Sequence, residues 1–272
     1  MPDTLTELYQ RLADVERRLS SQERKAKASG WQLNSIFNTH RFGGGQLMWG
    51  FDGHSRAILS SPGGLAWTEN AIADSNYRAT TYGGPNITLD GGAEYLSNTD
   101  ANWQESTTYP FLVWSWCYPT DISANRMIAA KYLWSTNNRS WYLRYDLALT
   151  DFTFLCNATG LAGGNVVVPS TYGAVVADEW YFVAGYFEPS TLMRIYVGMN
   201  TDARLTIDSL AAGVPASLYN GLAALTIGAD GNPATYFLGN IGIVGARANV
   251  PVAAIDDHVG MLFEMTKDVY EE

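Results

Sequence analysis

The loop Trp134-Ser-Thr-Asn137-Asn138-Arg139 has the composition of a carbohydrate-binding surface. An exposed indole can stack on the C–H face of a sugar ring, while neighbouring amide and guanidinium groups exchange hydrogen bonds with its hydroxyls. Trp103, flanked by two amide side chains, is a second candidate. The alternative is a structural role, because a β-rich chain with nine tryptophans buries most of them. The predicted glycan-binding residues are therefore Trp134, Asn137, Asn138, Arg139 and Trp103.

Residue patterns typical of common enzymes are missing. His40, His54 and His258 are scattered, without the His-Glu-x-x-His spacing that holds a catalytic zinc. The sequence has no Gly-x-Ser-x-Gly, no P-loop and no Gly-x-Gly-x-x-Gly opening a helix. Asp256 and Asp257 are adjacent near a predicted helix start, where carboxylates stabilise the helix dipole. We therefore expect a binding protein and not an enzyme.

The composition is typical of many short strands separated by turns. Aromatic residues make up 13% of the 272 residues and charged residues 16%, with 26 glycines and 10 prolines. The net charge is −10, and the acidic excess lies beyond residue 30. This charge disfavours nucleic acid as a partner, although solubility alone would also explain it. No signal peptide and no run long enough for membrane insertion is visible, so we expect synthesis in the cytoplasm.

Residues 1–30 predict a trimeric coiled coil. Apolar residues occupy successive a and d positions of a heptad pattern, namely Leu5, Leu8, Leu12, Val15 and Leu19. Arg11 at g and Glu16 at e complete a pattern that resembles a signature of parallel trimers, in which the arginine stem covers the seam and pairs with the neighbouring glutamate. The alternative is a helix that docks on its own domain.

Beyond the coil, residues 31–85 are rich in aromatic residues and glycine, and they predict a collar or connecting segment. Such a segment would pack between protomers or cover an edge of the next domain. Strand signals then recur through residues 86–272, with turn residues between them and no βαβ alternation. The approximate strand cores are 87–90, 94–97, 111–118, 127–132, 140–145, 151–156, 166–168, 180–187, 192–197, 205–207, 225–227 and 241–246. We expect an all-β, two-sheet antiparallel jelly-roll sandwich.

Most aromatic and sulfur side chains of these runs belong in the core. Trp116, Trp141 and Trp180 lie in strand motifs, and we assign all three to structural positions. Cys117 and Cys156 also lie in strand-like runs, and we expect two buried free thiols in preference to a disulfide.

The order of these motifs resembles a laminin-G/concanavalin-A-like lectin domain over roughly residues 86–265. The motifs that carry the resemblance are Leu89-Asp90-Gly91, Phe111-x-Val113-x-x-Trp116, Arg139-Ser140-Trp141-Tyr142-Leu143, Glu179-Trp180 and Phe237-x-Gly239-x-Ile241-Gly242. The resemblance implies a closing helix near residues 253–263. One hairpin departs from the family, because Tyr196-Val-Gly198-Met199-Asn200 stands where Tyr-x-Asn-Gly is common.

The resemblance also implies that Ca²⁺ could bind at a sandwich edge, with Asp90, Asp230 and Asn232 as its oxygen ligands. The alternative, which we favour, is that Asp230-Gly231-Asn232 is a turn with local hydrogen bonds and that no cofactor is needed. Glycosidases of this fold carry Glu-x-Asp-x-(x)-Glu on one strand, and this sequence has no such run.

A lectin-like sandwich on a trimeric coil, without an export signal, is typical of a bacteriophage virion surface protein made in the host cytoplasm. We expect a homotrimeric capsid decoration or head-fibre protein with capsid or other virion proteins as partners and host-surface glycans as ligands. Two alternatives stay open: a tail-associated fibre that binds host glycans, and a non-viral lectin or adhesion module.

Overall fold

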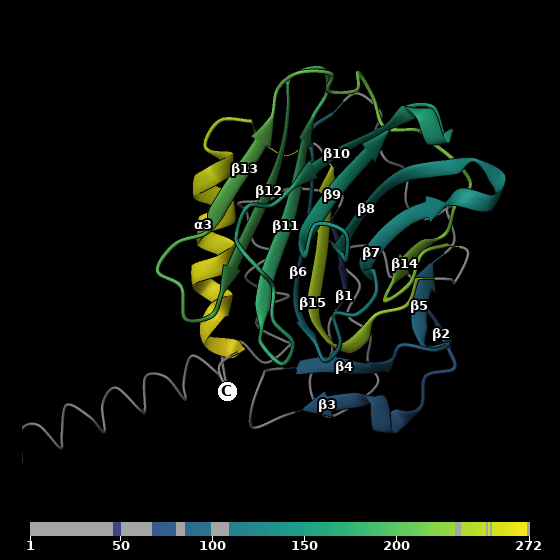
Figure 1. Ribbon diagram of the computed structural model, residues 1–272, viewed down its shortest axis with the longest axis vertical. Helices are drawn as coiled ribbons and strands as arrows, with labels where there is room; N and C mark the ends of the chain where they lie inside the picture. The colour runs from purple at the N-terminus through teal and green to yellow at the C-terminus, as the bar shows by residue number, and fades with distance from the viewer. Residues whose placement is uncertain are drawn as a thin grey trace, which may run out of the picture.

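Two antiparallel sheets lie face to face in the computed structural model, and one helix covers the outer face of the larger sheet (Figure 1). The structure describes residues 46–49, 67–79, 85–98, 109–231, 235–248, 250 and 252–270. The eight-stranded sheet has the order β13-β12-β11-β6-β15-β4-β3, with β1 also paired to β15. The seven-stranded sheet has the order β10-β9-β8-β7-β14-β5-β2.

The bounds of the elements are β1 (Gln46–Trp49), β2 (Thr68–Asn70), η1 (Asp74–Asn76), β3 (Tyr77–Ala79), β4 (Pro85–Asp90), β5 (Tyr95–Asn98), β6 (Phe111–Pro119), β7 (Arg126–Leu133), η3 (Trp134–Thr136), β8 (Asn138–Asp146), β9 (Asp151–Asn157), η4 (Ala162–Gly164), β10 (Asn165–Pro169), β11 (Tyr181–Glu188), β12 (Leu192–Met199), β13 (Thr206–Leu210), β14 (Leu225–Ile227), β15 (Leu238–Ala248), α3 (Ile255–Thr266) and η5 (Lys267–Val269). The predicted all-β sandwich is therefore confirmed, and each predicted strand core overlaps a strand, with several ends shifted by one to three residues.

The central strands are apolar on both faces because each face is covered. In β6, Val113 and Cys117 point into the core between the sheets, whereas Trp114 and Trp116 point to the opposite face. That opposite face lies under α3. A strand buried on both sides reads as a nearly continuous apolar run, which is what Phe111-Leu-Val-Trp-Ser-Trp-Cys117 shows.

Helix α3 confirms the closing helix that the resemblance implied. Val259 and Leu262 are buried against the eight-stranded sheet. The Trp116 indole N–H donates a 2.7 Å hydrogen bond to the Thr266 hydroxyl at the end of the helix. The Tyr270 hydroxyl, just beyond it, accepts a 2.8 Å hydrogen bond from the Ile243 backbone N–H. No helix in the described part of the chain combines the length and apolar character needed to span a membrane.

The two thiols behave as expected. Cys117 and Cys156 are free and buried on the facing sheets, and burial raises the pKa of both thiols. Because a thiol of raised pKa is a poor nucleophile, both are structural. Trp116, Trp141 and Trp180 are also buried, as predicted.

The segment assigned to a collar contributes strands to both sheets. β3 pairs with β4 at one edge of the eight-stranded sheet, and β2 pairs with β5 at an edge of the seven-stranded sheet. β1 pairs with β15. The sandwich therefore begins before residue 86, and the predicted boundary at residues 85/86 falls inside it. Residues 1–30, with the predicted coiled coil, lie outside the described residues.

Candidate functional site

Three loops meet at one end of the seven-stranded sheet. They are the β7–β8 turn at residues 134–138, the β9–β10 loop at residues 158–164, and the segment before β14 at residues 219–222. We call this surface the hairpin-end platform. Figure 1 shows the β7–β8 and β9–β10 turns projecting on the same side of the sandwich.

Backbone and side-chain hydrogen bonds hold the three loops together. The Arg139 guanidinium is buried and donates to the Trp134 carbonyl at 3.0 Å and to the Gly160 carbonyl at 3.4 Å, which joins the first loop to the second. The Asn138 side-chain oxygen accepts a 3.2 Å hydrogen bond from the Leu222 N–H, which joins the first loop to the third. The platform is therefore one connected surface.

Gly160 allows the loops to approach this closely. Its φ is +75°, a backbone conformation that residues other than glycine adopt only with steric strain. A Cβ there would lie 2.3 Å from the Asn137 carbonyl oxygen and 2.7 Å from the Tyr219 ring. The β9–β10 loop thus packs directly against both other loops, and a larger residue would force them apart.

Each loop exposes one large apolar side chain. Trp134 is 48% exposed, Leu161 is 53% exposed and Leu222 is 79% exposed. The remaining exposed side chains include Thr136 and Asn220, which can donate and accept hydrogen bonds. An exposed indole with neutral hydrogen-bonding groups beside it has the composition needed to stack on a sugar ring and contact its hydroxyls.

The other predicted glycan-binding residues have different positions. Asn137 adopts a left-handed conformation with φ of 57° at the end of η3, and its side-chain oxygen accepts a hydrogen bond from Arg139. The Asn138 side-chain amide donates hydrogen bonds to Thr136, and its oxygen accepts one from the Leu222 N–H. Arg139 was expected to reach a ligand, but its guanidinium is directed to carbonyl groups inside the protein and positions the loop instead. Trp103 lies outside the described residues.

Two of the three predicted calcium ligands can be placed. Asp90 is exposed and its carboxylate accepts a 2.7 Å hydrogen bond from the Gly92 N–H within its own turn. Asp230 is buried and already has an interaction partner. Burial raises the pKa of Tyr236, and the neighbouring Tyr95, Asp230 and Asp90 raise it further.

Asn232 lies outside the described residues. Within the part of the chain that the structure describes, no three His, Cys, Asp or Glu side chains gather as a metal site. Calcium binding therefore stays an expectation from the resemblance alone.

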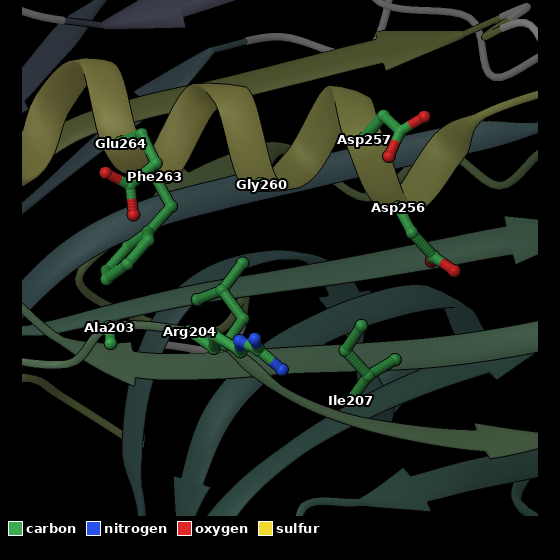
Figure 2. Close-up of a pocket in the computed structure, with 9 residues that line it drawn as sticks. Ala203, Arg204, Ile207, Asp256, Asp257, Gly260, Phe263 and Glu264 are labelled. Carbon is green, nitrogen blue, oxygen red and sulfur yellow. The ribbon is translucent and has the colours of Figure 1, made fainter.

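A second surface feature is a groove between α3 and the edge strand β13, which we call the α3–β13 groove. Its volume is about 390 Å³ and its lining includes Leu205, Ile207 and Phe263. Figure 2 shows α3 on one side, the segment around Arg204 on the other, and the Phe263 ring pointing from the helix into the groove.

Two of the four charged residues that line this groove form ion pairs. Asp256 lies in the first turn of α3, as predicted, and also accepts hydrogen bonds from Arg194 and from the Tyr196 hydroxyl. Burial raises the pKa of Tyr196, and the hydrogen bond to Asp256 raises it further. Glu264 pairs with Lys267 at 2.8 Å. The groove offers no exposed aromatic ring for a sugar, because Phe263 is buried.

Leu161, Leu222 and Gly160 are platform residues that the sequence analysis missed. A signal was present, because residues 152–177 and 209–229 hold no Asp, Glu, Lys, Arg or His. Long uncharged stretches that include exposed loops are unusual on an acidic surface. That pattern would have pointed to these loops, but it would not have shown that they meet at Trp134.

Comparison with known proteins supports the fold. A laminin-G family, described as the concanavalin A-like lectin/glucanases superfamily, matches residues 90–244. The binding domain of botulinum neurotoxin serotype G is similar in structure, with a TM-score of 0.57 and 10% identity over 81% of this chain and 50% of that chain. The binding domain of Paraclostridial mosquitocidal protein 1 gives 0.56 and 11% over 80% and 51%.

A third similar structure is the binding domain of botulinum neurotoxin DC in complex with rat synaptotagmin II, with a TM-score of 0.53 and 12% identity over 80% of this chain and 50% of that chain. The chain thus spans about half the length of these structures. At such identities the similarity shows the fold alone. No curated protein sequence is significantly similar to this chain.

Proposed function

The chain belongs to the concanavalin A-like lectin/glucanases superfamily, and from this premise we propose that it is a non-catalytic protein that binds glycans at the hairpin-end platform. The observation that carries the proposal is the half-exposed Trp134 at the point where three connected loops meet. Sugar rings present C–H faces that stack on such an indole, and the neighbouring hydroxyl and amide groups match sugar hydroxyls.

The lack of a catalytic pair also favours binding over hydrolysis. A glycosidase needs two carboxyl groups that face one sugar, about 5 to 10 Å apart. The three platform loops contain no Asp or Glu at all. A ligand held at Trp134 would therefore contact groups that recognise it without transferring a proton to it.

A glycan array with the full-length protein tests this proposal. We expect binding to a defined subset of oligosaccharides, with an Ile207→Ala variant in the α3–β13 groove giving the same pattern. Ile207 is 45% exposed and lies on β13 of the other sheet, outside the three platform loops, so this variant controls for general surface changes. Absence of binding above background to every glycan would contradict the proposal.

We also propose that three copies assemble through residues 1–30 and that the assembly is a virion surface protein of the capsid decoration type. The support is the heptad seam and the Arg11–Glu16 pattern in the sequence. Three platforms on one stem would raise the avidity of individually weak glycan contacts. The N-terminal end would then face the capsid, and the sandwiches would face outward.

Sedimentation equilibrium of the full chain tests the assembly. We expect a mass three times that of one chain at micromolar concentration. Leu12→Asp places a charge at a seam position and should give monomers with an unchanged β-sheet circular dichroism spectrum. A wild-type protein that sediments as a monomer would refute the trimer, and particles that lack the protein in immuno-electron microscopy would refute the virion setting.

A further inference from the structure

We propose that the hairpin-end platform selects neutral glycans and discriminates against glycans that carry carboxylate, sulfate or phosphate groups. This inference rests on the proposed function and specifies the ligand class of that same site. It comes from the distribution of charge around Trp134.

The three loops of the platform contain no charged residue. The chain as a whole is 16% charged, yet residues 132–138, 152–177 and 209–229 hold no charged side chain and no histidine. These stretches include all three loops of the platform. Their exposed polar side chains are hydroxyls and amides, among them Thr136, Thr159, Asn165 and Asn220.

Arg139 is the charged residue that adjoins the first loop, and it is not available to a ligand. It is only 8% exposed, its Nε is buried, and its terminal nitrogens donate to the Trp134 and Gly160 carbonyls and to Asn137. Its guanidinium also lies 5.9 Å from the Tyr132 ring. An anionic sugar would have to break these contacts to form a bidentate ion pair.

An acidic sugar would therefore lose part of its hydration at the platform without gaining a cation from the three loops that form it. Partial burial of an unpaired carboxylate is unfavourable. The net charge of −10 adds long-range repulsion of anionic ligands. A neutral hexose or N-acetylhexosamine meets neither penalty, and its hydroxyl and amide groups match the neutral groups of the loops.

Matched glycan pairs test the inference. Binding of the full-length protein is measured by biolayer interferometry to immobilised sialylated glycans and to the same glycans after sialidase treatment. We expect the neutral member of each pair to bind at least about fivefold more tightly. Affinity for the neutral member should change less than about twofold between roughly 0.05 and 0.5 M salt, because no exposed ion pair is screened. It should also stay constant between about pH 5 and 8, where histidines titrate.

A gain-of-charge variant gives the experiment a positive control. Asn220→Lys adds an exposed cation to the third loop, and Asn220→Gln is the matched neutral variant. We expect Asn220→Lys, but not Asn220→Gln, to improve binding of the sialylated member up to about fivefold and to make it sensitive to salt.

The outcomes separate this inference from the proposed function. Preference of the wild type for the sialylated member, lost at high salt, would overturn the selection for neutral glycans while leaving the glycan-binding function intact. Failure of both members of every pair to bind would overturn the proposed function, and the inference would fall with it.

Discussion

Trp134→Ala should reduce the affinity for glycans at least about tenfold. Tryptophans at the centre of a binding surface commonly contribute about 2 kcal/mol or more, and about 1.4 kcal/mol corresponds to a factor of ten. The fold should survive, because the Arg139 guanidinium contacts the backbone carbonyl of Trp134 and not its ring. The affinity is measured by biolayer interferometry on the best array ligand, with the melting temperature recorded for each variant.

Two further variants sharpen this test. Trp134→Phe keeps a stacking ring and should retain more affinity than Trp134→Ala. Leu149→Ala removes an apolar side chain that is equally exposed, at 49%, but lies in the β8–β9 turn, and it should bind as the wild type does. Wild-type affinity in Trp134→Ala, together with a normal melting temperature, would show that the ligand binds elsewhere.

Trp116→Ala should have the largest effect on stability. The Trp116 ring is 1% exposed and lies 5.9 Å from the Phe263 ring and 5.1 Å from the Tyr270 ring, in stacked orientations. Its indole N–H also bonds to Thr266. Removing a buried tryptophan leaves a cavity and deletes the hydrogen bond that the Thr266 hydroxyl accepts, although this hydroxyl still donates to the Leu262 carbonyl. We expect a loss of about 3–5 kcal/mol in the free energy of unfolding.

Urea denaturation followed by circular dichroism measures this loss. Thr266→Val serves as the matched variant, because it removes the acceptor of the buried Trp116 indole N–H but keeps the volume, and it should cost about 1–3 kcal/mol. A change of less than about 1 kcal/mol for Trp116→Ala would mean that the contact between α3 and the eight-stranded sheet contributes little to stability.

Most of the fold could be predicted because local patterns and global packing agree. Turn residues mark the ends of the strands. β12 directs Met193, Ile195 and Val197 into the core between the sheets, and Arg194 and Tyr196 to the opposite face under α3. β2 and β3 escaped prediction because their three residues each, Thr-Glu-Asn and Tyr-Arg-Ala, are largely polar, whereas the equally short β14, Leu-Thr-Ile, is apolar. Their strand conformation depends on pairing with β5 and β4, which lie elsewhere in the sequence.

The candidate site was predicted only in part, for a related reason. Residue type alone marked Trp134 as a stacking group, and its exposure agrees with that interpretation. Residue type could not show that the Arg139 guanidinium donates to backbone carbonyls, because the burial of this side chain depends on its contact with the β9–β10 loop. Likewise, Leu161 and Leu222 join Trp134 through contacts between loops that are far apart in sequence.

Hydrogen-exchange mass spectrometry of the full-length protein with a saturating neutral oligosaccharide shows where glycans bind. If the hairpin-end platform is the glycan site, we expect slower exchange in peptides that cover residues 133–138, 158–164 and 219–224, and unchanged exchange in peptides that cover residues 203–207 and α3. Protection confined to the α3–β13 groove, or to any surface without the Trp134 loop, would contradict it.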